Sequence, residues 1–138
     1  MRTLPITVAA DADYPLPGLL TLPDGAGPFP AVLLVHGSGP QDRDEAGGPN
    51  RPFRDLAVGL AALGVASLRY DKRTFAHGKR LTDALQGRLS VEEEVIRDAL
   101  CAAALLRAEP LICPDRVYLL GHSMGGMLAP RIDAEGGA

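Results

Sequence analysis

The sequence predicts an α/β protein built on an open, mostly parallel sheet with helices on both faces. Unbroken apolar runs begin near Ala31, Val65 and Arg116, as expected of parallel strands that are covered on both faces. Segments with helical apolar spacing separate these runs. Strands that alternate with helices at this spacing imply right-handed crossovers within one sheet.

The chain begins with two short β-prone segments, residues 2–8 and 16–22. The turn-forming sequences DADYPLPG and PDGAGPFP interrupt them, and proline and glycine are the strongest signals for turns. We therefore expect an antiparallel hairpin or meander at one edge of the sheet, ahead of the first buried strand.

A first helix is expected to begin near Pro52, with Asn50 as its cap and Gly64 just past its end. Proline suits the first turn of a helix, and glycine suits the left-handed residue that follows one. Helical spacing relates the apolar residues Phe53, Leu56, Ala57, Leu60 and Leu63. This face is expected to pack on the sheet.

A second helix is expected from Ser90 to Pro110, after a long loop that follows the strand from Val65. Ser90 and Glu93 have the spacing of a capping box. Acidic residues near the start and Arg107 near the end complement the helix dipole. The expected inner stripe is Val91, Val95, Ala99 and Leu100, and the acidic residues are Glu92, Glu93 and Glu94.

The bulk composition predicts a single soluble domain over residues 1–138. Hydrophobic residues make up 46% and charged residues 22% of the chain, which is a globular composition. A net charge of −3 gives no attraction to nucleic acid or anionic lipid. With no apolar stretch of membrane-spanning length, we expect a cytoplasmic protein that binds neither membrane nor nucleic acid.

The two cysteines, Cys101 and Cys113, have neither disulfide-framework nor metal-ligand spacing. We expect both to be reduced and at least one of them to be buried. The sequence contains no phosphate-binding loop and no dinucleotide fingerprint, so no cofactor is expected.

The sequence GHSMG at residues 121–125 has the pattern G-x-S-x-G directly between an expected strand and an expected helix. A turn this sharp crowds the backbone around Ser123, so Gly121 and Gly125 avoid a collision and leave the hydroxyl exposed. Gly126 extends this tolerance. We interpret Ser123 as a nucleophile; the alternative is a serine that only caps a helix.

Two loops are expected to supply an oxyanion hole at the carboxyl edge of the sheet. The N–H of Met124 opens the helix after Ser123 and is the first candidate donor. The loop after the first buried strand offers the second, from Ser38 or a neighbouring glycine such as Gly37.

Three motifs in this order, VLLVHGSGPQDRDE, LRYDKRT and LLGHSMGG, resemble the N-terminal half of α/β-hydrolase-fold serine hydrolases. They are especially similar to small microbial carboxylesterases that carry a GSGPxDRD loop. The resemblance runs from about Leu16 to Ile132. It implies a partial α/β-hydrolase fold, a triad in the chain order Ser-Asp-His, and hydrolysis of a small acyl ester through an acyl-enzyme on Ser123.

The family's acid and histidine come from later strands, and none of the 15 residues after Ser123 is a histidine. We therefore expect a truncated domain that lacks a complete triad and does not turn over by itself. The alternative is a non-catalytic remnant or interaction module. In either case the strand between Val117 and Leu120 would have an unpaired edge, through which a homodimer or another pairing could form.

The three histidines and the nearby acids are weak candidates for the missing groups. His36 is expected to shape its loop by hydrogen bonding, and His122 to pack beneath the elbow. His77 lies on the long loop at the functional edge; we regard it as a solvated residue, with a substitute base as the alternative. Asp133 and Glu135 are expected to point away along the last helix.

An acidic cluster, Asp42, Asp44 and Glu45 around Arg43, could be mistaken for a metal site. We expect instead a salt-bridged loop that holds the oxyanion segment, and no metal. A basic patch is expected to pair with this loop, not with an anionic substrate. The patch comprises Arg69, Lys72, Arg73, Lys79 and Arg80.

Overall fold

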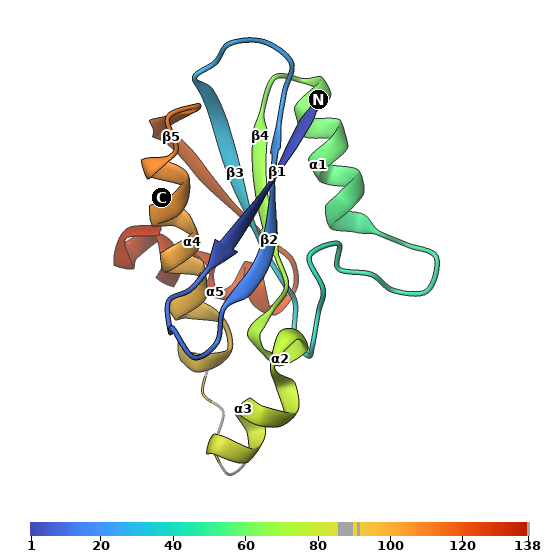
Figure 1. Ribbon diagram of the computed structural model, residues 1–138, viewed down its shortest axis with the longest axis vertical. Helices are drawn as coiled ribbons and strands as arrows, with labels where there is room; N and C mark the ends of the chain where they lie inside the picture. The colour runs from blue at the N-terminus through green and yellow to red at the C-terminus, as the bar shows by residue number, and fades with distance from the viewer. Residues whose placement is uncertain (86–89, 91, 138) are drawn as a thin grey trace.

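The computed structural model describes residues 1–85, 90 and 92–137. In this part of the chain five strands form one mixed sheet in the order β1-β2-β4-β3-β5 (Figure 1). The pairings of β3 with β4 and with β5 are parallel, whereas β1–β2 and β2–β4 are antiparallel. The strands are β1 (Arg2–Val8), β2 (Leu16–Leu22), β3 (Phe29–Val35), β4 (Ala66–Tyr70) and β5 (Ile112–Gly121). The expected α/β sheet and its N-terminal hairpin are confirmed.

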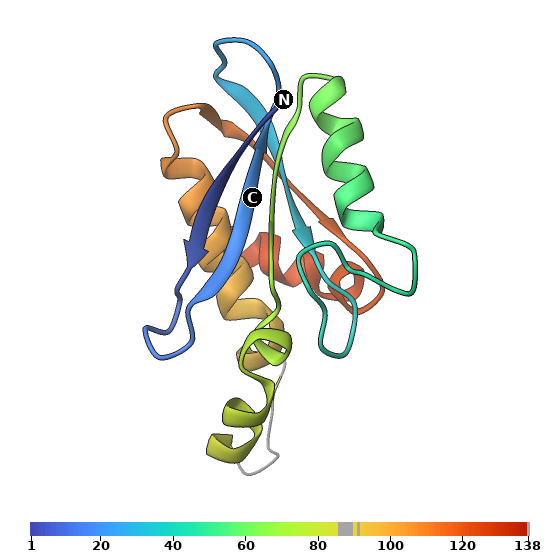
Figure 2. The same cartoon turned by 45° about the vertical axis from the view of Figure 1, so that its right-hand side comes forward.

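The helices cover both faces of this sheet (Figures 1 and 2). Helix α1 packs on β4 and β2, while α4 and α5 pack on β5 and β3. The carboxyl ends of β3, β4 and β5 lie at the same end of the sheet, where α2 and α3 project (Figure 2). The helices are α1 (Pro52–Ala62), α2 (Arg73–Ala76), α3 (Gly78–Leu85), α4 (Arg97–Ala108) and α5 (Met124–Ile132), with π-helical turns η1 (Glu92–Ile96) and η2 (Asp133–Gly137).

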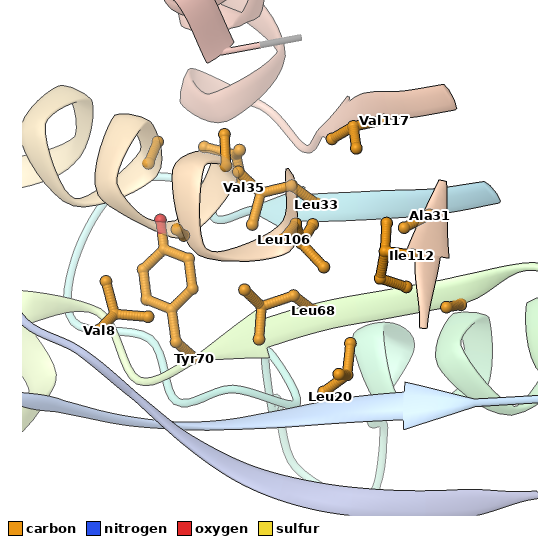
Figure 3. Close-up of a cluster of buried hydrophobic side chains, with 14 of the residues drawn as sticks. Val8, Leu20, Ala31, Leu33, Val35, Leu68, Tyr70, Leu106, Ile112 and Val117 are labelled. Carbon is orange, nitrogen blue, oxygen red and sulfur yellow. The ribbon is translucent and has the colours of Figure 1, made fainter. Parts of the chain in front are cut away.

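The main hydrophobic core lies between the sheet and α4 (Figure 3). Leu20, Leu33 and Leu68 project from three neighbouring strands, and Leu106 from α4; all four are fully buried. Burial of each such side chain contributes about 1.5–3 kcal/mol. This packing fixes the parallel strands whose carboxyl ends carry the candidate site.

The start of α1 differs from the expected cap at Asn50. Arg51 occupies the N-cap position and makes no side-chain cap hydrogen bond. Asn50 instead forms an isolated bridge with Gly47, because the loop before the helix turns back on itself. The expected end is confirmed: Gly64 follows the helix with a φ of 83°, in the left-handed region.

The segment after β4 is not the long loop that we expected, because residues 73–85 form α2 and α3. Helix α2 is anchored by a tertiary ion pair from Arg73 to Asp98, which local sequence does not reveal. The next helical segment begins as η1 and continues as α4, with Val95 and Ala99 buried and Leu100 packed partly buried against the core. Val91 and the side chains of Glu92 and Glu93, hence the expected capping box, lie outside the described residues.

No helix in the described ranges is long and apolar enough to cross a membrane. Cys101 and Cys113 are free thiols, as expected. Both are partly exposed, so the expectation that one would be buried is wrong. Cys101 lies on a partly exposed face of α4, and Cys113 lies near the start of the edge strand.

Candidate active site

Ser123 lies in the sharp turn that joins β5 to α5. Its backbone adopts a φ of 54° and a ψ of −115°, and its side chain is exposed. A positive φ is uncommon for a residue with a side chain, and such strain costs about 1–3 kcal/mol. The chain tolerates this strain because β5 and α5 hold the turn from both sides.

The glycines around Ser123 allow α5 to approach the sheet closely. A Cβ on Gly121 would lie 2.3 Å from the backbone of Gly125, and a Cβ on Gly125 would lie 2.3 Å from the Val35 carbonyl oxygen. Gly126 is less constrained, since its Cβ would meet the Gly121 oxygen at 3.1 Å. The turn therefore requires glycine at 121 and 125 for steric reasons.

The loop after β3 lies against this turn. A Cβ on Gly37 would lie 3.2 Å from Nδ1 of His122 and 3.4 Å from Cβ of Ser123. The His122 N–H donates to the Val35 carbonyl across 3.0 Å. We call residues 37–39 the oxyanion segment, after the role that the sequence predicts for this loop.

The backbone N–H groups at this surface differ in what they already bind. Gly37 N–H donates to Oε2 of Glu45 at 3.0 Å, and Gly125 N–H donates to the His122 carbonyl at 3.0 Å. Within the described residues, the N–H groups of Ser38 and Met124 have no protein acceptor. Met124 is the first residue of α5, where an N–H has no partner in its own helix. Ser38 and Met124 are therefore the candidate donors of the two loops, whereas Gly37 is engaged elsewhere.

Glu45 joins the oxyanion segment to the elbow. Its side chain is only 5% exposed, and Oε1 lies 2.9 Å from Nδ1 of His122, while Oε2 accepts from Gly37. The Asp42 carboxylate accepts from the N–H groups of Asp44 and Ala46 at 3.0 Å. The acidic loop thus holds the oxyanion segment, as its charge pattern suggested.

His122 does not pack beneath the elbow, contrary to expectation. Its side chain is 63% exposed and its ring is held from one side by Glu45. Neither His122 nor the other two histidines hydrogen-bonds the Ser123 hydroxyl within the described residues.

His36 is buried at the end of β3, with its ring against Phe53 and Tyr70. Burial lowers the pKa of His36 to about 4, and backbone hydrogen bonding to Tyr70 and Asp42 acts in the opposite direction. The imidazole is therefore neutral at pH 7. It packs at the start of the loop with no hydrogen-bond partner for Nε2 among the described residues, and it cannot reach solvent to exchange protons with a substrate.

His77 follows α2 as its C-cap residue. Its Nε2 is 2.7 Å from the Pro15 carbonyl oxygen, and its ring stacks edge-on to Tyr14. The structure therefore gives His77 a structural contact with the β1–β2 connection in place of the expected solvated loop. Glu135 lies 3.7 Å from Arg131 on the last turns.

Among the described residues of the basic patch, only Arg69 pairs with the acidic loop. Arg73 pairs with Asp98, and Arg80 lies over the Tyr14 ring, so the expected pairing with that loop is wrong for most of the patch. Arg43 binds Asp71 through its backbone N–H and its guanidinium. Arg69 faces Asp44 at 3.4 Å, an ion pair without hydrogen-bond geometry. Lys72 differs from these arginines because it binds backbone groups as well as a carboxylate. Its Nζ donates to the carbonyl oxygens of Gly37 and Gly39 and to Glu94, each at 2.9 Å.

The sequence pattern distinguishes Glu45 and Lys72 only as members of charged clusters. Their individual roles in holding the oxyanion segment had no separate sequence signal. The described residues contain no group of three side chains that could hold a metal ion.

A mixed α/β sheet with a glycine-lined strand–turn–helix and an exposed serine defines the class of α/β hydrolases by fold and motif. The chain belongs to the alpha/beta hydrolase family, whose model matches residues 32–138. An esterase named EstD from Thermotoga maritima is 53% identical over 117 residues, which cover 85% of this chain and 27% of that esterase. The chain thus spans about a quarter of the length of this relative.

Solved structures of longer hydrolases share the fold. A dienelactone hydrolase from Anabaena variabilis superposes with a TM-score of 0.68 and 26% identity, over 98% of this chain and 58% of that one. An esterase from the archaeon Pyrobaculum calidifontis gives a TM-score of 0.64 and 22% identity, over 97% of this chain and 39% of that one. At that identity, the second likeness concerns the fold alone.

Proposed function

We propose that this chain carries the nucleophilic half of a serine ester hydrolase, with Ser123 as nucleophile and the N–H groups of Ser38 and Met124 as oxyanion donors. The observation that carries the proposal is the exposed Ser123 at a φ of 54°, set between two loops whose unengaged N–H groups include those of Ser38 and Met124. The similarity to the Thermotoga maritima esterase supports ester hydrolysis as the reaction class.

In the proposed reaction the Ser123 Oγ attacks the carbonyl carbon of a small acyl ester. The Oγ proton passes to a base, the carbonyl oxygen becomes an oxyanion, and the two N–H groups stabilise it. The tetrahedral intermediate then breaks its bond to the alcohol oxygen, which leaves with a proton. Water hydrolyses the acyl-enzyme and regenerates the serine.

The base and its orienting acid are proposed to come from polypeptide beyond residues 1–138 or from a partner. His36 is buried and neutral, and His77 contacts Pro15. His122 is committed on one side to Glu45. Without a base the chain retains the oxyanion donors, so slow acylation by an activated ester is the expected residual chemistry.

A second candidate function is an interaction module, and the uncovered edge of β5 favours it. In the described sheet β5 pairs only with β3, and Tyr118 on it is 56% exposed. An open hollow of about 500 Å³ lies beside this edge, lined by Tyr118, Leu119, Gly126, Ala129, Pro130 and Asp133. We propose that a second copy of the chain pairs with β5 here, between Val117 and Leu120, when the chain is alone.

Hydrolysis of p-nitrophenyl acetate by the purified chain tests the first proposal, with Ser123→Ala as the comparison. We expect a burst of nitrophenolate equal to the protein concentration, an acetyl group on Ser123 by mass spectrometry, and negligible turnover. Equal release by both proteins would contradict acylation at Ser123. Steady turnover that needs Ser123 would instead reveal a base within the chain.

A further inference from the structure

Lys72 is a buried ammonium group placed directly against the oxyanion segment. Its side chain is 2% exposed, and it follows β4 at the start of α2. The ammonium has three N–H donors, and its three contacts are the carbonyl oxygens of Gly37 and Gly39 and Oε1 of Glu94. All three donors are used, so Lys72 is neither a free base nor a free anion site.

The contact with Gly37 determines the direction of the Ser38 N–H. In a planar trans peptide the C=O of one residue and the N–H of the next point to opposite sides. Because Lys72 Nζ binds the Gly37 carbonyl oxygen at 2.9 Å, the Ser38 N–H of the same peptide group must point away from Lys72. That N–H has no protein acceptor among the described residues, and Ser38 is exposed.

The remaining groups of the segment are held as well. Glu45 fixes the N–H of Gly37, and Lys72 also binds the carbonyl of Gly39, on the far side of Ser38. A cation on the Gly37 carbonyl also polarises the peptide group and strengthens its N–H as a donor. Lys72 thus acts on Ser38 in two ways, through orientation and through polarity.

We propose that Lys72 is a positioning residue for acyl transfer: by binding the Gly37 carbonyl it directs and polarises the Ser38 N–H as an oxyanion donor. This inference rests on the proposed function of Ser123. It adds a residue that touches no substrate and acts only through the peptide group between Gly37 and Ser38.

The test uses the whole chain and a p-nitrophenyl alkylphosphonate ester. Ser123 Oγ forms a bond to phosphorus, the bond to the nitrophenyl oxygen breaks, nitrophenolate leaves, and the Oγ proton passes to buffer. Lys72→Met keeps the side-chain stem and removes the ammonium. We expect phosphonylation of Ser123 to slow roughly 10- to 100-fold, which is less than the loss of a whole oxyanion donor causes. The maximal rate constant should fall, while the reagent concentration that gives half of the maximal rate stays unchanged.

Asp98→Asn is the matched control, because it weakens a neighbouring buried ion pair without touching the oxyanion segment. Asp98 binds Arg73 with N···O distances of 2.9 and 2.7 Å. This variant should lose stability in urea and keep a phosphonylation rate within about twofold of the wild type. If Asp98→Asn slows as much as Lys72→Met, general destabilisation explains both and the proposal is overturned.

The amide resonances of Ser38 and Gly37 give a second readout that does not require reactivity. In the unreacted chain, Lys72→Met should move the Ser38 amide proton upfield, while the Gly37 amide, held by Glu45, changes less. An unmoved Ser38 amide overturns the proposal even if Ser123 reacts. If the wild type does not react at Ser123 but the Ser38 amide responds as expected, the proposed function fails and the contact role of Lys72 stands.

Lys72→Arg replaces the first variant if Lys72→Met does not fold. It keeps a buried cation beside Glu94 but spreads its donors in a planar fork. The Gly37 carbonyl then loses its aligned donor, so slower phosphonylation and a shifted Ser38 amide are again expected. A Lys72→Arg chain that matches the wild type in both measurements overturns the proposal.

Discussion

Replacing Gly125 by alanine should open the elbow and slow the reaction of Ser123. The new Cβ would lie 2.3 Å from the Val35 oxygen and 2.5 Å from the His36 oxygen. Real Cβ contacts start near 3.0 Å, so the first turn of α5 must withdraw from β3 by about 0.7 Å. Overpacking of this kind costs about 1–3 kcal/mol, and the better helix propensity of alanine returns about 1 kcal/mol.

We therefore expect Gly125→Ala to lose about 0–2 kcal/mol of unfolding free energy, measured by urea denaturation. A displacement near 1 Å at a reacting group can cost on the order of 100-fold in rate. Phosphonylation of Ser123 should fall by a comparable factor.

Gly59→Ala is the control, because nothing lies within 4 Å of its Cβ on the exposed side of α1. It should gain up to about 1 kcal/mol of stability and react like the wild type. A Gly125→Ala chain as stable and as reactive as Gly59→Ala would refute the argument that close approach of α5 to β3 shapes the elbow.

Three further predictions concern the buried groups and the open edge. Burial lowers the His36 pKa from its ordinary value of 6.5 to about 4, so its stabilising contribution is complete above pH 6.5 and is lost as the pH falls towards 4. Between pH 7.5 and 5 the wild type should lose about 2 kcal/mol more unfolding free energy than His36→Gln; parallel pH profiles would contradict this. Asp98→Ala removes the hydrogen-bonded partner of the buried Arg73 and leaves it only the more distant Asp11 carboxylate, at 3.9 Å, among the described acids. It should cost about 3–5 kcal/mol in urea denaturation; a loss below 1 kcal/mol would show that Asp11 or water compensates the guanidinium. Tyr118→Lys places a charge on the β5 edge and should shift sedimentation from dimer to monomer; a wild type that is already monomeric argues against edge pairing.

Local patterns predicted most of the fold. The apolar runs marked β3, β4 and β5, and the glycines at 121 and 125 marked a turn that only glycine permits. These signals are local, because burial on both faces and steric crowding act within a few residues. The helices over residues 73–85 were missed, because Arg73 is stabilised by Asp98, 25 residues away.

The candidate site was predicted in part. The nearness of the two loops follows from parallel strands whose carboxyl ends share one edge. The sequence did not reveal that Gly37 N–H is occupied by Glu45, nor that His122 turns out to solvent against the same carboxylate. Both depend on the path of a loop with little regular structure, where periodicity carries no information.

The sequence by itself determined the fold class and the position of the sharp turn at Ser123. Only the tertiary structure decided which charged residue binds which backbone group. Lys72 reaches a carbonyl 35 residues earlier in the chain, and that contact exists because the sheet order places β4 beside β3. Short-range patterns reflect propensity and burial, whereas the pairing of polar groups is settled by which strands become neighbours.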